Sequence, residues 1–267
     1  MEGEDRVLIV IPCYNESARL NVPGYFQVLR RSNTHLLFVN DGSTDDTLSH
    51  LKKIENMAPD QISVLSLDKN RGKAEAVRRG MLRAIHDGAE IVGYIDADMA
   101  TPSEEVLRLV KVCEKRDVSV VMGSRVATMG IDVQRHWLRH YLGRLFAYMA
   151  GFILKMRIYD TQCGAKFFRM SSLLKAALEE QFISRWAFDV ELIGRLNVGM
   201  SYEKRLNKRR FLEVPLERWK DVAGSKVKFH HMIVTFSDMI RIWFDLKKRK
   251  RRGGAGIDLR KTGEVNG

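Results

Sequence analysis

Continuous apolar runs alternate with helix-period segments over the first 125 residues of the chain. Because a short apolar run bounded by polar residues is typical of a buried strand, strands are expected at Val7–Ile11, Leu36–Val39, Ile62–Leu67, Ile91–Ile95 and Val118–Met122. Between them, segments such as Ala74–Ile85 and Glu104–Lys115 carry apolar residues at helical spacing. This alternation predicts an α/β fold built on a single doubly wound, mainly parallel sheet with helices on both faces.

The pattern changes after residue 125. Amphipathic helical patterns cover residues 131–156, 182–198 and 227–246. A short strand is predicted over 211–216, and the last helix leads into the basic run Lys247–Arg252. We therefore expect one domain over residues 1–230, an amphipathic basic helix over 231–252 and a glycine-rich, disordered tail over 253–267.

Each predicted strand of the first half ends in a polar segment. In chain order these segments are Pro12–Glu16, Asn40–Ser43, Asp68–Lys73, Asp96–Asp98 and Gly123–Arg125. Because the carboxyl ends of parallel strands lie at the same edge of a sheet, we expect these carboxylates, cations and small turn residues to lie together. Open α/β sheets bind their ligands at this edge.

Asp96 and Asp98 are two residues apart at a strand end, so both side chains can point to the same side. Two convergent carboxylates suit Mg²⁺ or Mn²⁺, which prefer oxygen ligands and take the remaining ones from phosphates and water. An isolated Asp-x-Asp is more often part of a solvated loop. The position of this pair, directly after an apolar strand and beside four other polar strand ends, favours a metal site.

Neither the glycine-rich dinucleotide fingerprint nor the P-loop occurs in the sequence. Lys69, Arg71 and Lys73 surround Gly72, an arrangement that suits either a phosphate or the solvated start of a helix. Asp41 precedes a Gly-Ser-Thr turn, whose hydroxyl residues fit a helix cap better than Asp41 does. Asp41 is therefore a candidate acceptor of hydrogen bonds from a base, and a nucleotide would be held by side chains at the strand ends.

Composition narrows the class of partner. Apolar residues make up 45% of the 267 residues and charged residues 29%, as in a globular protein, and the formal net charge is +12. This charge favours nucleic acid, phosphorylated ligands or an acidic membrane surface. Three scattered cysteines indicate reduced thiols in an intracellular protein. We expect no signal peptide and no membrane-spanning segment, which needs about 18 consecutive apolar residues.

The helical pattern over 131–156 has an apolar side and a cationic side. Its apolar residues include Trp137, Tyr141, Leu145, Tyr148 and Phe152, and its basic band includes Arg135, Arg139 and Arg144. This pattern is typical of a helix lying in a membrane surface, although a core-packed helix with a solvated face has the same spacing. The run Lys247–Arg252 favours the membrane, because anionic lipids attract such clusters by about 1 kcal/mol per residue. We therefore expect peripheral attachment to the cytoplasmic face of a membrane through 131–156 and 229–252.

The order and spacing of the strand-end motifs resemble the family-2 glycosyltransferases of the GT-A fold, in which PxYNE-type, NDGS-type and Asp-x-Asp motifs recur. The similarity continues to about residue 230 through Asp160–Gly164, Arg185–Leu192, Trp219 and Gly224–Lys226. These strings are similar to those of dolichyl-phosphate β-glucosyltransferases and their prokaryotic relatives. The sister mannosyltransferases usually lack the Thr-Gln-Cys and Arg-Trp elements. The resemblance implies a nucleotide-sugar half over 1–125 and an acceptor half over 126–230.

The resemblance also implies a role for each candidate residue. The catalytic group would be Asp96, Asp98, Arg125 and Asp189, with the metal on Asp96 and Asp98. The donor would be bound by Pro12, Tyr14, Glu16, Val39, Asp41, Lys73, Ala97, Lys220 and Lys226. The acceptor would be bound by Arg135, Arg139, Gln162, Trp219 and Ser225. Eukaryotic members carry a membrane-spanning segment, which is not found in this sequence.

The implied function is inverting transfer of a hexose, with glucose and UDP-glucose favoured, from a nucleotide sugar to a dolichyl or polyprenyl phosphate. A phosphate acceptor is already an anionic nucleophile and needs no general base, whereas a sugar hydroxyl would need one, from Asp189 or Glu191. The alternatives are a GDP-mannose-dependent polyprenyl-phosphate mannosyltransferase and a family-2 enzyme acting on a glycan or other soluble acceptor. A non-catalytic nucleic-acid-binding module is a remote alternative; no recognised motif supports it, and no nucleic-acid partner is expected. The oligomeric state is left open.

Overall fold

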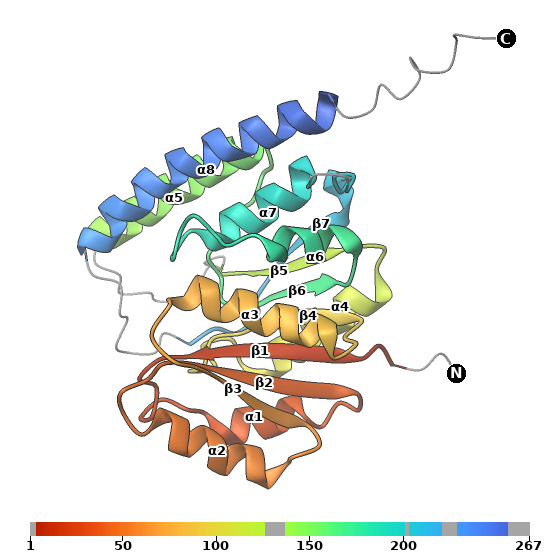
Figure 1. Ribbon diagram of the computed structural model, residues 1–267, viewed down its shortest axis with the longest axis vertical. Helices are drawn as coiled ribbons and strands as arrows, with labels where there is room; N and C mark the ends of the chain where they lie inside the picture. The colour runs from red at the N-terminus through yellow and green to blue at the C-terminus, as the bar shows by residue number, and fades with distance from the viewer. Residues whose placement is uncertain (1–3, 126–136, 201–202, 221–228, 256–267) are drawn as a thin grey trace, which may run out of the picture.

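The computed structural model describes residues 4–125, 137–200, 203–220 and 229–255 (Figure 1). Along 137–144, 229–233 and 252–255 this description covers the helical backbone and not the side chains. Within it, seven strands form one sheet in the order β3-β2-β1-β4-β6-β5-β7. The strands are β1 Val7–Cys13, β2 Thr34–Asp41, β3 Ile62–Leu67, β4 Ile91–Tyr94, β5 Val120–Ser124, β6 Lys166–Arg169 and β7 Phe211–Pro215.

The sheet confirms the predicted α/β fold with one mainly parallel sheet, and β6 is the exception. This strand lies between β4 and β5 and runs antiparallel to both. It was missed in the sequence because it has four residues and a charged residue at each end, Lys166 and Arg169. Its insertion brings residues from the second half of the chain into the middle of the sheet.

Helices cover both faces of the sheet, as the alternating pattern predicts. They are α1 Val22–Val28, α2 Thr47–Met57, α3 Lys73–His86, α4 Ser103–Lys115, α5 Trp137–Leu154, α6 Ser172–Glu179, α7 Phe188–Val198 and α8 Phe229–Ala255. Residues of β1 alternate between the two cores: Leu8 and Val10 pack with α3, α6 and α7, and Val7, Ile9 and Ile11 pack with α1, α2 and α4.

Three predicted helices differ from the observed ones at their starts or ends. Helix α5 ends at Leu154 instead of residue 156, and the predicted part over 131–136 lies outside the described residues. Helix α7 begins at Phe188 instead of residue 182. Residues before α7 form a turn because the Ser184 hydroxyl accepts the backbone N–H groups of Trp186 and Ala187. The last helix extends beyond the predicted end at 246, through the basic run, to Ala255.

Helix α8 lies along α5 and packs on α7 (Figure 1). Met239, Ile242 and Leu246 form a buried stripe at helical spacing and belong to the main core. Each such side chain contributes about 1.5–3 kcal/mol relative to an exposed one, so α8 is firmly held to the domain. Among the described helices, none is both long and apolar enough to cross a membrane.

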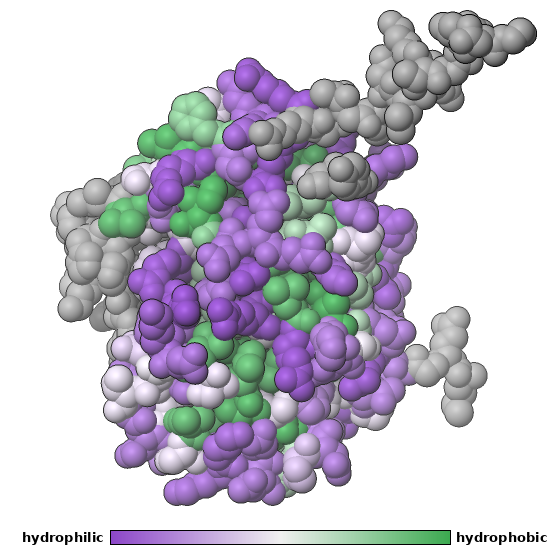
Figure 2. Space-filling model, in the orientation of Figure 1, coloured by the Kyte–Doolittle hydropathy of each residue, from purple (hydrophilic) through white to green (hydrophobic). Residues whose placement is uncertain are grey.

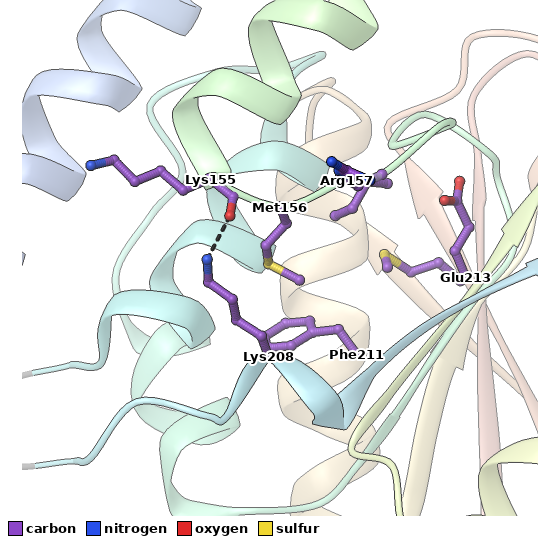
Figure 3. Close-up of a pocket in the computed structure, with 8 residues that line it drawn as sticks. Lys155, Met156, Arg157, Lys208, Phe211 and Glu213 are labelled. Atoms are coloured by element: carbon purple, nitrogen blue, oxygen red, sulfur yellow. Dashed lines mark hydrogen bonds between the residues drawn. The ribbon is translucent and has the colours of Figure 1, made fainter.

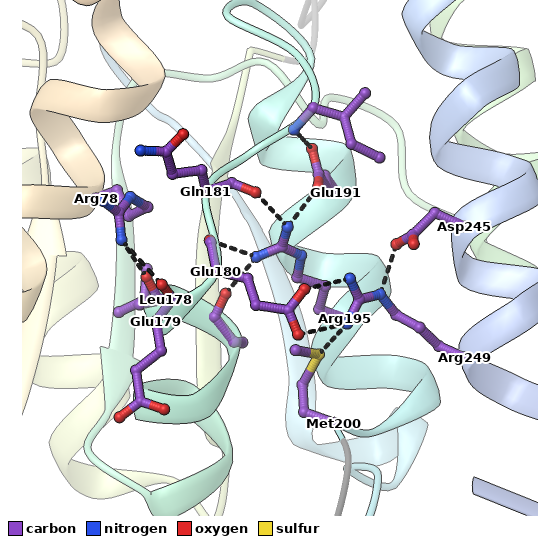
Figure 4. A network of polar contacts seen from close by, with 12 residues as sticks. Arg78, Leu178, Glu179, Glu180, Gln181, Glu191, Arg195, Met200, Asp245 and Arg249 are labelled. Atoms are coloured by element: carbon purple, nitrogen blue, oxygen red, sulfur yellow. Dashed lines mark hydrogen bonds and ion pairs between the residues drawn. The ribbon is translucent and has the colours of Figure 1, made fainter. Parts of the chain in front are cut away.

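Two arginines join α7, α8 and the segment after α6 (Figure 4). Arg195 of α7 is almost fully buried, pairs with the Glu191 carboxylate at 2.6 Å and donates to backbone carbonyls, including that of Gln181 at 2.8 Å. Arg249 of α8 pairs with Glu180 at 2.5 Å. These contacts fix the polypeptide that leads from α6 towards the start of α7.

Candidate functional site

The loops after β1 and β2 are joined by hydrogen bonds at the carboxyl edge of the sheet. The Glu16 backbone N–H donates to the Thr47 hydroxyl at 2.8 Å, and the Ser17 hydroxyl donates to the Asp45 carboxylate at 2.7 Å. The first two polar strand ends therefore form one braced structure. Their proximity is what the parallel sheet predicts.

Asp41, at the end of β2, organises the turn before α3. Its two carboxylate oxygens accept the backbone N–H groups of Arg71 at 2.7 Å and Gly72 at 2.8 Å. Gly72 has a φ of +95°, which favours glycine, and the Arg185 guanidinium lies 2.6 Å from the position of a Cβ there. Burial raises the pKa of Asp41 above its ordinary value. A base that bound Asp41, as the resemblance implies, would share a carboxylate that already holds this turn.

Asp96 follows β4 and lies between Lys73 and Gly164. The Lys73 ammonium donates to Asp96 Oδ1 at 2.5 Å. A Cβ at position 164 would fall on the Asp96 carboxylate, so this approach requires glycine. Burial raises the pKa of Asp96, but the attraction of Lys73, assisted by Arg125 and Lys166, outweighs it and holds the pKa below the ordinary value. Asp96 is therefore an ionised carboxylate, with 37% of its side-chain surface exposed to a ligand.

Asp98 is linked to the first loop through Arg19. Arg19 Nη1 lies 3.6 Å from Asp98 Oδ2, and the same guanidinium donates to both oxygens of Glu16 at 2.6 and 2.8 Å. Burial and the negative charge of Asp96 together raise the pKa of Asp98. The two predicted metal ligands therefore influence each other's charge, and their pKa values shift in opposite directions: that of Asp96 is lowered and that of Asp98 is raised.

These carboxylates fit a divalent cation that is shared with a ligand. Among the described residues, no group of three or more His, Cys, Asp or Glu side chains is arranged to hold a metal by itself. Mg²⁺ usually binds through one or two carboxylates and completes its coordination with phosphate oxygens and water. A cation on Asp96 and Asp98 would relieve the repulsion that raises the Asp98 pKa.

Arg125, at the end of β5, forms a two-point ion pair with Asp160. Arg125 Nε donates to Oδ2 at 2.7 Å and Nη2 donates to Oδ1 at 3.0 Å. The Glu213 carboxylate of β7 holds the Asp160 loop by accepting the backbone N–H groups of Tyr159 and Asp160. The Arg125 guanidinium lies 5.7 Å from the Trp219 ring centroid. The structure thus places the predicted acceptor residue Trp219 beside the predicted catalytic residue Arg125.

Asp189 lies in the first turn of α7 and is almost fully buried. Its Oδ1 is 2.7 Å from the Lys166 ammonium and accepts the Tyr94 hydroxyl. Burial lowers the pKa of Lys73, but the attraction of Asp96 and then of Asp189 outweighs it and raises the pKa above the ordinary value. Glu191, the other base candidate, is instead paired with Arg195 in the interior (Figure 4). Asp189 is therefore the candidate that lies among the groups around Asp96.

The remaining donor candidates of the first half lie along the same edge. Pro12 pairs in register with Val39, and Tyr14 follows on the first loop, partly buried. The Val39 side chain is fully buried against α3, so only its backbone is available to a ligand. The Ala97 carbonyl accepts the buried Tyr25 hydroxyl, which anchors the backbone between the two aspartates.

The candidates of the second half are only partly described. The Lys220 backbone N–H donates to the Ala100 carbonyl at 3.0 Å, which places this exposed lysine near the Asp96–Asp98 loop. The Gln162 backbone N–H donates to Asp160 at 3.1 Å, and its side chain is exposed. Arg135, Arg139, Ser225 and Lys226 lie outside the residues whose side chains the structure describes.

The sequence analysis missed three residues that build this site: Arg19, Tyr94 and Lys166. Arg19 follows Glu16 by three residues, a spacing at which opposite charges commonly pair. Lys166 interrupts an otherwise apolar segment, and a lysine in such a place is rarely buried unless it is paired. Tyr94 gave no signal, and Gly164, although part of the Asp160–Gly164 string, was given no role, because the contacts of both residues depend on where β6 enters the sheet.

A separate cavity of about 250 Å³ lies where the end of α5 meets β5 and β7 (Figure 3). Its lining is half apolar and half charged: Met122, Met156, Ile158 and Phe211 with Lys155, Arg157, Lys208 and Glu213. None of these is a predicted site residue. The Lys208 ammonium is already bonded to the Lys155 carbonyl at 2.6 Å.

Comparisons with known proteins show the family to which this chain is similar. The sequence model of glycosyl transferase family 2 matches residues 8–182. A dolichyl-phosphate beta-glucosyltransferase of Trichomonas vaginalis is 32% identical over 247 residues, which are 87% of this chain and 69% of that protein. The dolichyl-phosphate beta-glucosyltransferase of Saccharomyces cerevisiae is 30% identical over 241 residues, 82% of this chain and 68% of that protein.

Solved structures are similar in fold. Glucosyl-3-phosphoglycerate synthase of Mycobacterium tuberculosis, in complex with Mn²⁺, UDP-glucose and phosphoglyceric acid, has a TM-score of 0.65 and 15% identity, over 90% of this chain and 80% of that chain. A mannosyltransferase of Pyrobaculum calidifontis, in complex with GDP-Man and Mn²⁺, has a TM-score of 0.55 and 18% identity, over 99% of this chain and 77% of that chain.

Asp160→Asn should remove part of the loss of folding stability that the protein shows at acid pH. Burial raises the pKa of Asp160, but its hydrogen bonds with Arg125 and the charge of that arginine outweigh burial and lower the pKa. A carboxylate of this kind contributes stability above its unfolded-state pKa of about 3.9, and this stability is lost as the pH falls towards the folded-state value. In urea titrations, we expect the variant to be less stable than the wild type near neutral pH, with the difference shrinking below about pH 4.

Asp60→Asn, at an exposed carboxylate after α2, serves as the control and should leave the pH dependence unchanged. A stability difference for Asp160→Asn that stays constant into acid would contradict the assignment of an ionised, paired Asp160.

Proposed function

This chain belongs to glycosyl transferase family 2, and we propose that it transfers glucose from UDP-glucose to a dolichyl or polyprenyl phosphate at a membrane surface. The observation that carries the proposal is the extent of the similarity. The relatives named dolichyl-phosphate beta-glucosyltransferase match 82% to 87% of the chain, well beyond the donor half. The site residues of the second half, Asp160 and Asp189 among them, are packed directly around those of the first half.

Asp96 and Asp98 are proposed as the residues that hold a divalent cation, Mg²⁺ or Mn²⁺, together with the pyrophosphate of the donor. Such a cation acts as a Lewis acid and neutralises the charge that develops on a departing nucleoside diphosphate. Two structures of similar fold are described as complexes with Mn²⁺ and a nucleotide sugar, which supports this assignment.

Cations of this chain surround the proposed pyrophosphate position. Lys73 contacts Asp96, Arg125 is held by Asp160, and Lys220 extends from a backbone anchored beside Asp98. Arranged in advance, these charges stabilise the leaving group without reorganisation during the reaction. They also reduce the repulsion between an anionic donor and an anionic acceptor.

A lipid phosphate can attack the anomeric carbon directly, because it is ionised at neutral pH and needs no general base. One direct displacement inverts the anomeric configuration. Asp189 would then bind a hydroxyl of the transferred sugar, since it lies beside Lys73 and Asp96 and is held from behind by Lys166 and Tyr94. Trp219, next to Arg125, would contact the acceptor.

Attachment to a membrane is proposed through the outer surfaces of α5 and α8. Large apolar side chains are exposed there: Leu145, Tyr148 and Phe152 on α5, and Val234, Ile240 and Phe244 on α8. Figure 2 shows apolar groups interrupting the polar surface in the upper part of the molecule, the region of these helices in Figure 1. The basic run follows these residues along α8 and suits the anionic headgroups of a cytoplasmic leaflet.

The strongest alternative keeps the donor site and uses a soluble acceptor. The structural neighbour described with phosphoglyceric acid favours this alternative, because a small phosphorylated acid would also use the cations near Arg125. A second alternative replaces UDP-glucose by GDP-mannose, as in the complex of the mannosyltransferase of similar fold.

UDP in the presence of Mn²⁺ should raise the melting temperature of the wild type more than GDP does. A ligand that binds only the native state stabilises it in proportion to ln(1 + [L]/Kd), so the preferred base is read directly. In Asp98→Asn, the Mn²⁺-dependent part of the UDP shift should disappear while the metal-independent part remains. Asp60→Asn is the matched control, and an undiminished Mn²⁺-dependent shift in Asp98→Asn would overturn the metal assignment.

Radiolabelled UDP-glucose should yield a glucosylated lipid when polyprenyl phosphate is supplied, and the same acceptor with GDP-mannose should yield far less product. Parallel reactions contain 3-phosphoglycerate or an oligosaccharide as acceptor. Product confined to a soluble acceptor would replace the proposed function with the strongest alternative.

The wild type should float with vesicles that contain anionic phospholipid at low salt, and less so at high salt. Combining Phe152→Ser with Phe244→Ser removes two exposed aromatic side chains, whose burial in lipid contributes about 1.5–3 kcal/mol each, so binding should fall at least about tenfold. The control is Met57→Ser, at an equally exposed apolar residue on α2. Wild-type protein that stays at the bottom at low salt, or an equal loss in the control, would rule out this surface.

A further inference from the structure

Lys166 is a fully buried cation in the centre of the sheet. Its ammonium lies 2.7 Å from Asp189 Oδ1, donates to the Cys163 carbonyl at 2.5 Å and lies 5.5 Å from the centroid of the Tyr94 ring. A buried ammonium is costly unless it is paired and hydrogen-bonded, so a fold retains one only when its partners fix it in place. Acceptors and an aromatic face surround the Lys166 ammonium here.

The backbone holds Lys166 opposite Tyr94. The two residues are register partners in the antiparallel pair of β4 and β6, so their side chains project from the same face of the sheet. Helix α7 covers this face, and Asp189 lies in its first turn. Lys166 and Tyr94 therefore approach Asp189 together from the sheet.

Lys166 and Tyr94 both contact the same oxygen of Asp189. Lys166 pairs with Oδ1, and the Tyr94 hydroxyl donates to the same atom. Within the described part of the chain, the hydrogen bond to the Asp189 carboxylate reaches Oδ1, and the ion pair with Lys166 is shortest at the same atom. The side chain keeps 8% of its surface exposed. Its orientation is thus fixed from behind, and Oδ2 is available to a ligand.

We propose that Lys166 is the positioning residue of Asp189: it fixes Oδ1 so that Oδ2 is presented to a hydroxyl of the transferred sugar. The inference rests on the proposed function, in which Asp189 lies beside the donor sugar. Without Lys166, the carboxylate would keep the Tyr94 hydrogen bond but lose its second anchor, and its χ1 and χ2 angles would be free to change. Misplacement of a contacting group by about 1 Å can lower a rate about 100-fold.

The test is a double-mutant cycle between Lys166→Met and Asp189→Asn. Lys166→Met should lower kcat about 100-fold while leaving the affinity for UDP with Mn²⁺ unchanged, because the nucleotide is held by other residues. Asp189→Asn should give a similar or larger loss of kcat. In the Asp189→Asn background, Lys166→Met should change kcat less than about threefold, since a residue that acts through Asp189 has no further effect once Asp189 is altered.

Two matched variants accompany the cycle. Lys175→Met makes the same substitution at an exposed lysine on α6 and should keep the wild-type kcat. Tyr94→Phe removes the other donor to Oδ1 without removing a charge, and with Asp189→Asn it forms a second cycle if Lys166→Met fails to fold. The thermal shift with UDP and Mn²⁺ shows which variants retain a folded donor site.

Losses that multiply in the double variant would overturn the inference, because Lys166 would then act independently of Asp189. A wild-type kcat in Lys166→Met, or a loss that is confined to UDP affinity, would overturn it as well. The cycle is also measured on the slow hydrolysis of UDP-glucose, which needs no acceptor. A chain that hydrolyses UDP-glucose but does not glucosylate polyprenyl phosphate refutes the proposed function, and the hydrolysis cycle still tests the role of Lys166.

Discussion

The antiparallel hydrogen bonding of β6 with β4 and β5 is the constraint on which the site depends. The parallel strands alone bring Asp41, Asp96 and Asp98 to one edge. The loop before β6 supplies Asp160 to Arg125 and the backbone of Gly164 to Asp96, and β6 itself supplies Lys166 to Asp189. The strand and the loop before it therefore bring these residues of the second half into contact with the candidate site residues of the first half.

The ion pairs around this site differ in how far they are exposed to solvent. Lys166 with Asp189 and Arg195 with Glu191 are removed almost fully from solvent, whereas Asp96 with Lys73 remains open. Ion pairs in the interior are poor sources of stability, because desolvation offsets much of their attraction. Their value here is geometric, since each pair holds a loop or a carboxylate in one orientation. The open pair of Asp96 and Lys73 is the one that the proposed metal and pyrophosphate would reorganise.

The sequence was most informative where local pattern decides structure. Apolar runs and strand-end carboxylates placed Asp96 and Asp98 at the correct edge, because period and position along parallel strands suffice for that prediction. The order of the sheet was beyond reach, since a four-residue strand with charged ends carries little local signal. Asp189 and Glu191 lie two residues apart in an apolar segment, and the sequence does not distinguish them. Packing does, because it places Glu191 in the interior and Asp189 beside Asp96. Asp41 was found, but its backbone partners depend on the conformation of Gly72.

Helix α8 was expected as a basic helix beyond the domain. Its packing against the domain determines where it lies relative to the candidate site. Leu246 lies against Gly194 so closely that a Cβ on the glycine would meet its methyl group, and Arg249 joins α8 to Glu180. Helix α8 is continuous from Phe229 to Ala255, and its buried stripe belongs to the same core as α7, the helix that carries Asp189. If the enzyme rests on a bilayer through α8, the height of its active site above the lipid is a fixed dimension of the fold. The phosphate of a lipid acceptor would then have to lie at that height above the bilayer. The distance that an acceptor's phosphate can extend from the lipid would become a criterion for selecting acceptors.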